Sequence, residues 1–175
     1  MNHKLASIFA LAVAGALAVQ AQAPAGPPSV ATAAKATYTR IKTNFQKAAE
    51  KMPEENYSFK PVAEVESFGE RVAHISRPQL ATCSALTGER KTAAPNPKAT
   101  KAELVAALSE SFAACDKAFD ALTDANALEA VSAGRGQQTR ITQLYGVIVH
   151  ANEVYGAMGV YMRLKGIVPP SSEPR

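Results

Sequence analysis

Two histidines, His74 and His150, are the side chains in this sequence best suited to metal chemistry. They lie in "ERVAHIS" and "IVHANEVYG", two segments predicted to be helical. Residues four apart on a helix share a face, with Cβ atoms about 6 Å apart, so His-x₃-His is the usual start of a metal site on one helix. The position four residues after His150 is Val154, which cannot bind a metal. The sequence therefore predicts two imidazole ligands where a catalytic zinc site has three protein ligands.

Two carboxylates near these histidines are candidate substitutes. Glu70 precedes His74 by one helical turn, so it is suited either to ligate a metal or to orient the imidazole as a second-shell acceptor. Glu153 neighbours the face of His150 but points about 100° away from Val154 on an ideal helix. Both histidines also fit a structural role, as interior side chains hydrogen-bonded to carbonyls, waters or tyrosine hydroxyls. The residues leave both interpretations open.

Other chemistries find little support in the sequence. There is no Gly-x-Ser-x-Gly motif of the kind that presents a serine nucleophile. The formal net charge is +4, and the basic residues are scattered rather than clustered with aromatic residues. The chain lacks the electrostatic footprint of a nucleic-acid-binding protein, and we expect no nucleic-acid partner.

The first 23 residues have the layout of a secretory signal peptide. A short segment with Lys4 precedes an apolar run, and small residues follow it. Residues 24–29, "PAGPPS", then form a Pro/Gly linker. No later window is apolar enough to span a membrane, so we expect an exported protein, periplasmic or secreted, without an integral span once the signal is removed.

The two cysteines, Cys83 and Cys115, lie on different predicted helices. A disulfide is permitted in an exported compartment, but it requires the two helices to be adjacent, with Cα atoms within about 7 Å. Both positions are on apolar stripes, where buried free thiols act as small apolar residues. We favour free thiols and keep the disulfide as the alternative.

Apolar residues recur every three to four positions in four segments, which predicts an all-α protein. Such amphipathic helices bury their stripes together as a four-helix bundle, here over residues 30–170, followed by a tail over 171–175. The second connection is long enough for a crossover. The four helices are predicted at about 30–51, 67–88, 100–122 and 140–165.

Two details of this helical pattern carry further expectations. Pro78 interrupts the second helix and is expected to kink it, because proline donates no hydrogen bond and clashes with the preceding turn. Residues 123–138 are expected to form a long loop with at most a short helical turn around 127–131, and no strand is predicted anywhere in the chain.

Two long stretches of the chain resemble the DinB-like family, in its exported bacterial branch. They are "MPEENYSFKPVAEVESFGERVAHI" and "VHANEVYGAMGVYMRLKGIVPPSS". The resemblance implies a four-helix bundle with a crossover, often as a homodimer. In many members it also implies a divalent metal such as zinc or nickel, held by one histidine of the second helix and two of the last. His74 and His150 match two of these ligands, and the third falls on Val154.

Three functions are compatible with these observations. The favoured one is a binding module with a degenerate metal site between the second and fourth helices, with no cofactor and an unspecified small-molecule ligand. The second is a divalent-metal-dependent transferase or hydrolase that uses a substitute ligand. The third is a structural or interaction protein that acts as a homodimer.

Overall fold

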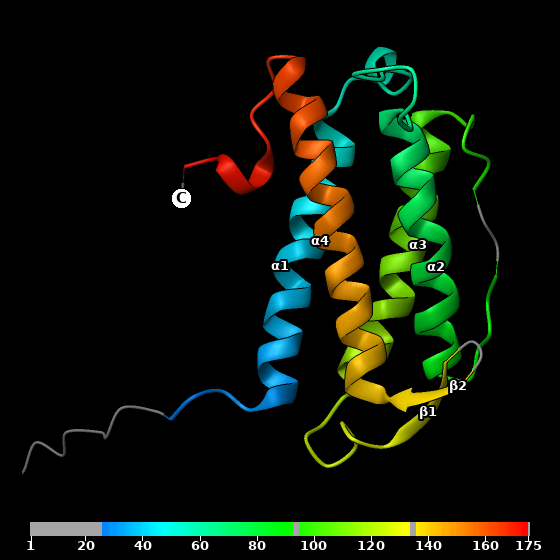
Figure 1. The fold of residues 1–175 in the computed structure, drawn as a ribbon, viewed down its shortest axis with the longest axis vertical. Helices are drawn as coiled ribbons and strands as arrows, with labels where there is room; N and C mark the ends of the chain where they lie inside the picture. Colours follow the sequence, from blue (N-terminus) through cyan, green and yellow to red (C-terminus); the bar gives the residue numbers. More distant parts are fainter. Residues whose placement is uncertain (1–25, 93–94, 134–135, 175) are drawn as a thin grey trace, which may run out of the picture.

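The computed structural model describes residues 26–92, 95–133 and 136–174, and within them it confirms the predicted helical bundle. Four long helices run side by side (Figure 1). They are α1 (Val30–Lys51), α2 (Phe68–Leu86), α3 (Lys101–Asp120) and α4 (Arg140–Leu164). Their bounds agree with the predicted segments to within a few residues.

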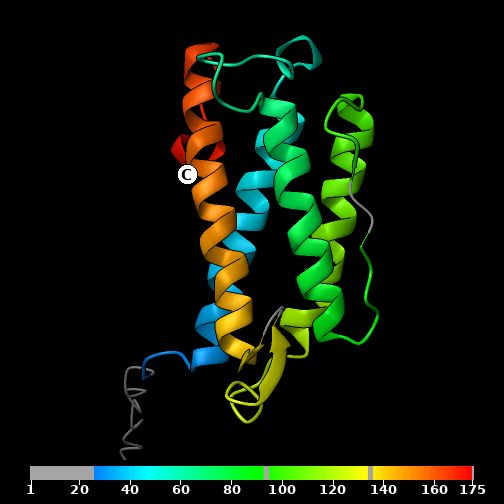
Figure 2. The same ribbon diagram turned by 45° about the vertical axis from the view of Figure 1, so that its right-hand side comes forward.

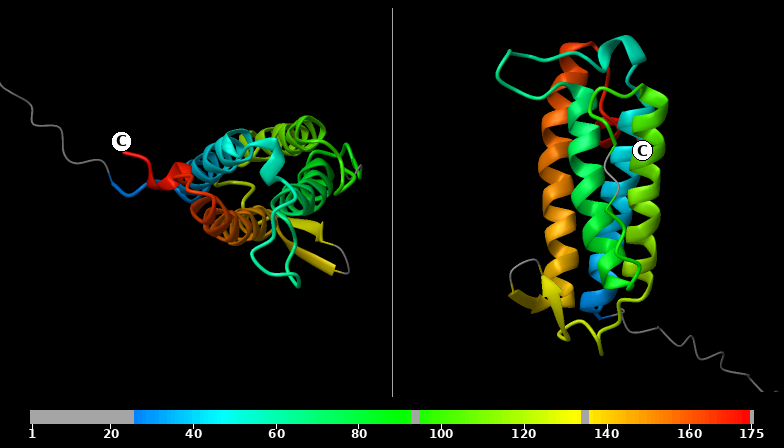
Figure 3. Two further views of the ribbon diagram at one scale, coloured as in Figure 1. Left: turned by 90° about the horizontal axis from the view of Figure 1, so that it is seen from above. Right: turned by 90° about the vertical axis from the view of Figure 1, so that its right-hand side faces the viewer.

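The chain order around the bundle includes the predicted crossover. The helix α2 packs against α3 on one side and against α4 on the other, while α1 closes the bundle between α3 and α4. Viewed from above, the four helices surround a common centre (Figure 3). Figure 1 shows that α2 and α3 run in the same direction, so the chain returns along the length of the bundle between them. By contrast, α2 and α4 are antiparallel, so the beginning of α2 lies beside the end of α4.

Local signals in the sequence explain where the helices begin and end. The Ser67 hydroxyl accepts from the Glu70 backbone N–H, and the Glu70 carboxylate accepts from the Ser67 N–H, so the predicted capping box is confirmed. Thr100 and Glu103 cap α3 in the same way. Gly88 follows the end of α2 with φ of +82°, a left-handed conformation that glycine adopts without a Cβ clash.

One sequence expectation about secondary structure needs correction. The loop before α4 contains an antiparallel hairpin, β1 (Ala130–Ala133) and β2 (Gly136–Thr139), at the end of the bundle where α4 begins (Figure 2). The prediction of no strand was therefore wrong, because strands of four residues carry too few positions for a readable alternation. Pro78 lies inside α2, which continues through it to Leu86, in agreement with the predicted extent of the second helix.

The core is dense in aromatic and aliphatic side chains contributed by all four helices. Tyr38 stacks on Phe119 with ring centroids 4.0 Å apart, and Phe45 meets Phe112 edge-on. Complete burial of such side chains stabilises a fold by roughly 1.5–3 kcal/mol each. The largest fully buried residues are Phe45, Phe68, Phe112, Phe119, Met52, Ile75, Leu104, Leu108, Leu122, Leu144, Ile148 and Met158.

A disulfide joins Cys83 of α2 to Cys115 of α3, with Cα atoms 4.8 Å apart. Both cysteines are fully buried. The expectation of two free thiols was therefore wrong, and the alternative is the one that the structure contains. Parallel packing of α2 and α3 brings positions near the two helix ends to the same level, which the sequence spacing alone does not reveal.

The C-terminal residues after α4 fold back onto the bundle. We call Val168–Pro174 the C-terminal strap; it contains the short 3₁₀ helix η2 (Pro170–Ser172) and lies beside α1 and α4 (Figure 1). Lys51 holds it by donating to the carbonyl of Val168 and pairing with Glu173. Most of the predicted tail is therefore part of the folded body.

The described residues include no helix that is both long and apolar enough to cross a membrane. The predicted signal peptide, and the first two residues of the predicted linker, lie outside the described residues. Of the linker, 26–29 are irregular and exposed, and Ser29 caps α1.

Candidate functional site

The antiparallel packing of α2 on α4 brings His74 and His150 together. Their Nε2 atoms are 3.1 Å apart, and the ring centroids are 5.2 Å apart with an angle of 65° between the planes. The two histidines are 76 residues apart in the chain, so only the packing of the two helices creates the pair. The sequence prediction that these imidazoles meet between the second and fourth helices agrees with this geometry.

The pair lies at the edge of the seam between α2 and α4 rather than in the interior. The His74 side chain is 45% exposed, and His150 is half-buried. An interior structural role, one of the two interpretations of the sequence, does not describe His74. Partial burial lowers the pKa of His150, and the neighbouring His74 lowers it further, while Glu153 acts in the opposite direction. His150 is therefore uncharged near neutral pH.

Glu66, a residue that the sequence interpretation missed, fixes the orientation of His74. Its carboxylate lies 3.2 Å from Nδ1 of His74. The Tyr161 hydroxyl of α4 donates to the Glu66 backbone carbonyl, and Arg71 lies 3.8 Å from the Glu66 carboxylate. Glu66 precedes α2, so helical periodicity gives no signal for it. Its contact with a histidine eight residues later becomes visible only when the path of the chain before α2 is known.

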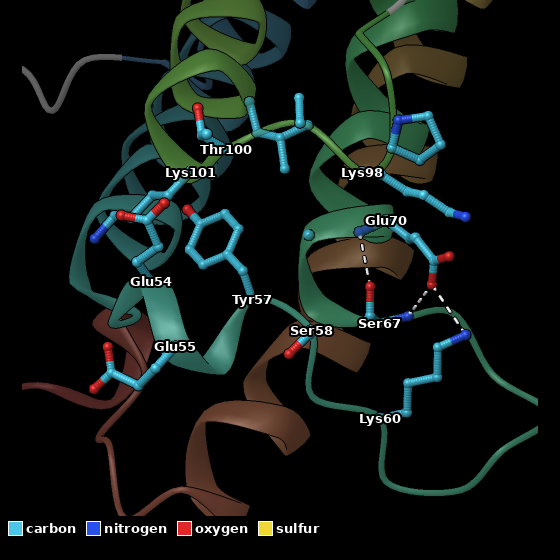
Figure 4. A pocket seen from close by; sticks show the side chains of 14 residues that line it. Glu54, Glu55, Tyr57, Ser58, Lys60, Ser67, Glu70, Lys98, Thr100 and Lys101 are labelled. Atoms are coloured by element: carbon cyan, nitrogen blue, oxygen red, sulfur yellow. Dashed lines mark hydrogen bonds and ion pairs between the residues drawn. The ribbon is translucent and has the colours of Figure 1, made fainter.

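The carboxylate predicted for that role, Glu70, is engaged elsewhere. It accepts a hydrogen bond from the Ser67 N–H at 2.6 Å and pairs with Lys60 at 3.1 Å. Figure 4 shows both contacts, at the side of a pocket of about 390 Å³ that also contains Tyr57. These contacts lower the pKa of Glu70, chiefly through the Ser67 backbone bond. Glu70 therefore caps α2, and Glu66 takes the place beside the imidazole.

The donor set does not fit a metal held by three protein ligands. Val154 lies four residues after His150 and is buried in the core, with 4% of its surface exposed. Glu153 is exposed on the outer side of α4. Across the described part of the chain, no group of three or more histidine, cysteine or acidic side chains converges on one point. The predicted ligands Glu70 and Glu153 thus do not join the histidines in a cluster.

Two hollows lie on either side of the histidine pair. The larger, of about 470 Å³, is lined by His74, Arg77, Pro78 and Pro97 among others. The smaller, of about 130 Å³, is lined by His150, Gln79 and Pro78. Pro78 borders both hollows, so they are neighbours, and a ligand in either one meets one of the two imidazoles.

The protonation pattern of the pair follows from its partners. A carboxylate only accepts hydrogen bonds, so Nδ1 of His74 carries a proton that it donates to Glu66. With that proton on Nδ1 and no second proton on the ring, Nε2 of His74 is an acceptor, and this tautomer requires Nε2–H of His150 to be the donor. The pair can exchange this internal bond for bonds to a ligand, with His74 accepting and His150 donating.

Comparisons with known proteins agree with the observed fold. No curated protein matches the chain. A solved structure, the crystal structure of a conserved protein from Enterococcus faecalis, is similar with a TM-score of 0.61. The match covers 79% of this chain and 98% of that one at 17% sequence identity, so it supports the fold alone. The family model of the DinB superfamily matches residues 37–154, which include both histidines and all of α2 and α3. The chain therefore belongs to the DinB superfamily.

Proposed function

We propose that the protein is an exported binding module that recognises a small molecule at the His74–His150 pair without a resident metal. The observation that carries this proposal is the 3.1 Å approach of the two Nε2 atoms at a solvent-accessible seam, with Glu66 orienting one ring. In the tautomers described above, the pair offers one acceptor and one donor to a polar group of a ligand. The flanking hollows give room for the rest of the molecule.

Export is supported by the disulfide between Cys83 and Cys115. Disulfides persist in oxidising compartments and are rare in the cytosol of most organisms. Mass spectrometry of the protein recovered from periplasmic or culture fractions tests this part of the proposal. A mature mass that lacks about the first 23 residues is expected, and full-length protein confined to the cytosol would contradict it.

The binding role is tested by NMR of the two imidazole rings. The Cε1–Hε1 resonances of His74 and His150 are followed while acetate or N-methylacetamide is added, since these probes present the acceptor and donor groups that the pair can bond. We expect both rings to shift, and we expect His150→Ala to remove the shift of His74. Rings that do not respond to either probe at tens of millimolar would overturn the proposal.

The alternative function, a divalent-metal-dependent transferase or hydrolase, is favoured by Glu66. Metal-binding histidines commonly donate their second ring nitrogen to a carboxylate, and His74 does so. Metal content measured after incubation with zinc or nickel separates the two functions. We expect well under one ion per chain, because two imidazoles hold a divalent ion weakly. One tightly held ion per chain, lost in His74→Ala, would instead establish the metal-dependent alternative.

A second alternative, pairing with another copy of the chain, is favoured by the outer face of α4. Tyr145, Val149, Val160 and Leu164 follow one side of this helix and are each at least half exposed. Light scattering coupled to size-exclusion chromatography measures the oligomeric state. A dimer that becomes a monomer in Val149→Glu would support this role, and a monomer at all concentrations would exclude it.

A further inference from the structure

Another hollow, on the opposite side of α4 from the histidine pair, lies between α1, α4 and the C-terminal strap. Its volume is about 570 Å³. Arg40, Asn44 and Lys47 line it from α1. Positions four and seven residues apart return to the same side of a helix, so these three side chains form one row along α1. We call this hollow the basic groove.

The other walls of the basic groove are fixed by hydrogen bonds. The Tyr155 hydroxyl of α4 accepts from the Ser171 backbone N–H at 2.9 Å and bonds the Ser171 side chain at 3.0 Å. Arg163 donates to Ser172 at 2.9 Å. Asn152 donates to the carbonyl of Ile148, and no described residue donates to its amide oxygen. The groove is therefore a constructed space with polar groups in place, rather than a gap beside a loose tail.

The groove has an unbalanced positive charge. Its one acidic side chain, Glu173, pairs with Lys51 at 2.6 Å, and this contact lowers the pKa of Glu173, with a smaller contribution from the charge of Lys47. Arg40 and Lys47 make no hydrogen bond or ion pair with any described residue. The two cations outnumber the one carboxylate of the groove, which is already paired with Lys51, so an anionic ligand would complete the charge balance.

The spacing of the two cations indicates the shape of that ligand. Seven residues correspond to about 10 Å along a helix axis. Ile41, the residue after Arg40, lines the floor of the groove and is 3% exposed, so it presents a narrow apolar strip rather than a broad surface. We propose that the basic groove binds an elongated organic dianion, with one acidic group at Arg40 and the other at Lys47. Its apolar middle lies on Ile41, and Asn44 and Asn152 bond its polar atoms.

The proposal is tested with suberate, a dicarboxylate with six methylene groups between its acidic ends. The side-chain amide resonances of Asn44 and Asn152 report binding by NMR at low ionic strength, because both residues line the groove. Succinate, acetate and inorganic phosphate serve as shorter or single-ended probes. We expect suberate to shift both amides and to bind about tenfold more tightly than acetate, since it makes two charged contacts rather than one.

Single substitutions then assign the contacts. Arg40→Gln and Lys47→Gln are each expected to weaken the affinity for suberate about fivefold. Acetate should still bind at the cation that remains in each variant. Arg77→Gln is the matched control, because it removes the same charge from an exposed arginine beside the histidine pair. Equal losses in Arg77→Gln and Arg40→Gln would overturn the proposal. So would phosphate binding as tightly as suberate, or amides that stay unmoved by suberate at tens of millimolar.

Discussion

The helix α2 takes part in two seams of very different character. Towards α3 it is joined by the buried Cys83–Cys115 disulfide and by the hydrogen bond from Gln79 to Ser111, all of which are inaccessible to solvent. Towards α4 its polar contacts include the solvent-accessible pair of His74 and His150 and the hydrogen bond from Arg71 to the Tyr161 hydroxyl. The first seam fixes the position of α2 with a covalent bond, and the second uses that fixed helix to hold an imidazole in place.

This difference explains how an open site can keep its geometry. A solvent-exposed hydrogen bond between two neutral rings contributes little to stability, so it cannot itself hold two helices together. The close approach of α2 to α3 begins at Gly69, where a Cβ would lie 3.2 Å from Leu104 and Tyr57. The α2–α3 seam therefore stabilises the fold, while the α2–α4 seam is free to exchange its internal bond for a ligand.

Removing the disulfide is expected to have the largest effect on stability, because it weakens the α2–α3 seam and leaves the α2–α4 seam intact. The double variant Cys83→Ala/Cys115→Ala is expected to lower the free energy of unfolding by about 3 to 4 kcal/mol, because the bond closes a loop of 32 residues in the unfolded chain. Urea denaturation with and without reductant measures the loss. The control is His74→Ala, which is expected to change the free energy by less than about 0.5 kcal/mol because the side chain is nearly half exposed. Equal losses at the two seams would contradict the comparison.

The helical architecture was predictable because its signals are local and repeated. The apolar stripe of α1 and the capping boxes at Ser67 and Thr100 each specify a boundary within a few residues of the chain. The hairpin was missed because its two strands span only four residues each. The disulfide was judged wrongly because the parallel arrangement of α2 and α3 is a property of the whole bundle.

The candidate site was predictable only in part, for a similar reason. The histidines could be found because each lies on a predicted helix, and their meeting follows from the packing of those helices. Glu66 could not be found in this way, because it precedes α2 and reaches His74 from an irregular segment. Glu70 has the right helical spacing, but its nearer partners, the Ser67 N–H and Lys60, take its carboxylate.

The next prediction concerns a variant in which a bound metal would stabilise the α2–α4 seam. Val154→His adds a third imidazole one turn after His150. Without metal, placing a polar ring at this buried position is expected to cost about 1 to 3 kcal/mol. With zinc at about 100 times its dissociation constant, binding should restore about 2.7 kcal/mol. Thermal unfolding with zinc or with a chelator measures both effects.

A matched variant separates metal binding from the effect of a larger side chain. Val154→Gln also places a polar group at the buried position, but the amide is a poor zinc ligand, so zinc should not restore its stability. If Val154→His responds to zinc no more than Val154→Gln does, the three positions do not converge on a common point.

A smaller effect compares the two carboxylates near the site. Glu70→Gln is expected to cost about 1 kcal/mol, because it weakens the cap of α2, and to leave the nitrogen chemical shifts of His74 unchanged. Glu66→Gln should do the reverse, because it removes the acceptor that fixes the proton on Nδ1 of His74. Urea denaturation and ¹⁵N NMR of the imidazoles measure the two effects. A Glu70→Gln variant with altered His74 tautomers would contradict the assignment of Glu66.

The smallest expected effect is a pH dependence that originates in the α2–α4 seam alone. Burial and His74 lower the pKa of His150 in the folded protein, whereas in the unfolded chain a histidine has a pKa of about 6.5. The unfolded chain therefore binds a proton first as the pH falls. The stability linked to this residue is fully present above pH ~6.5 and is lost as the pH decreases through the folded pKa. Because solvent screens a half-exposed ring, the change should stay below about 1 kcal/mol.

Unfolding followed between pH 7.5 and 5 should show a flatter profile for His150→Gln than for the parent protein, while the disulfide variant should keep the parent slope at lower stability. Identical slopes in His150→Gln and the parent would mean that the folded environment does not disfavour the charged imidazole.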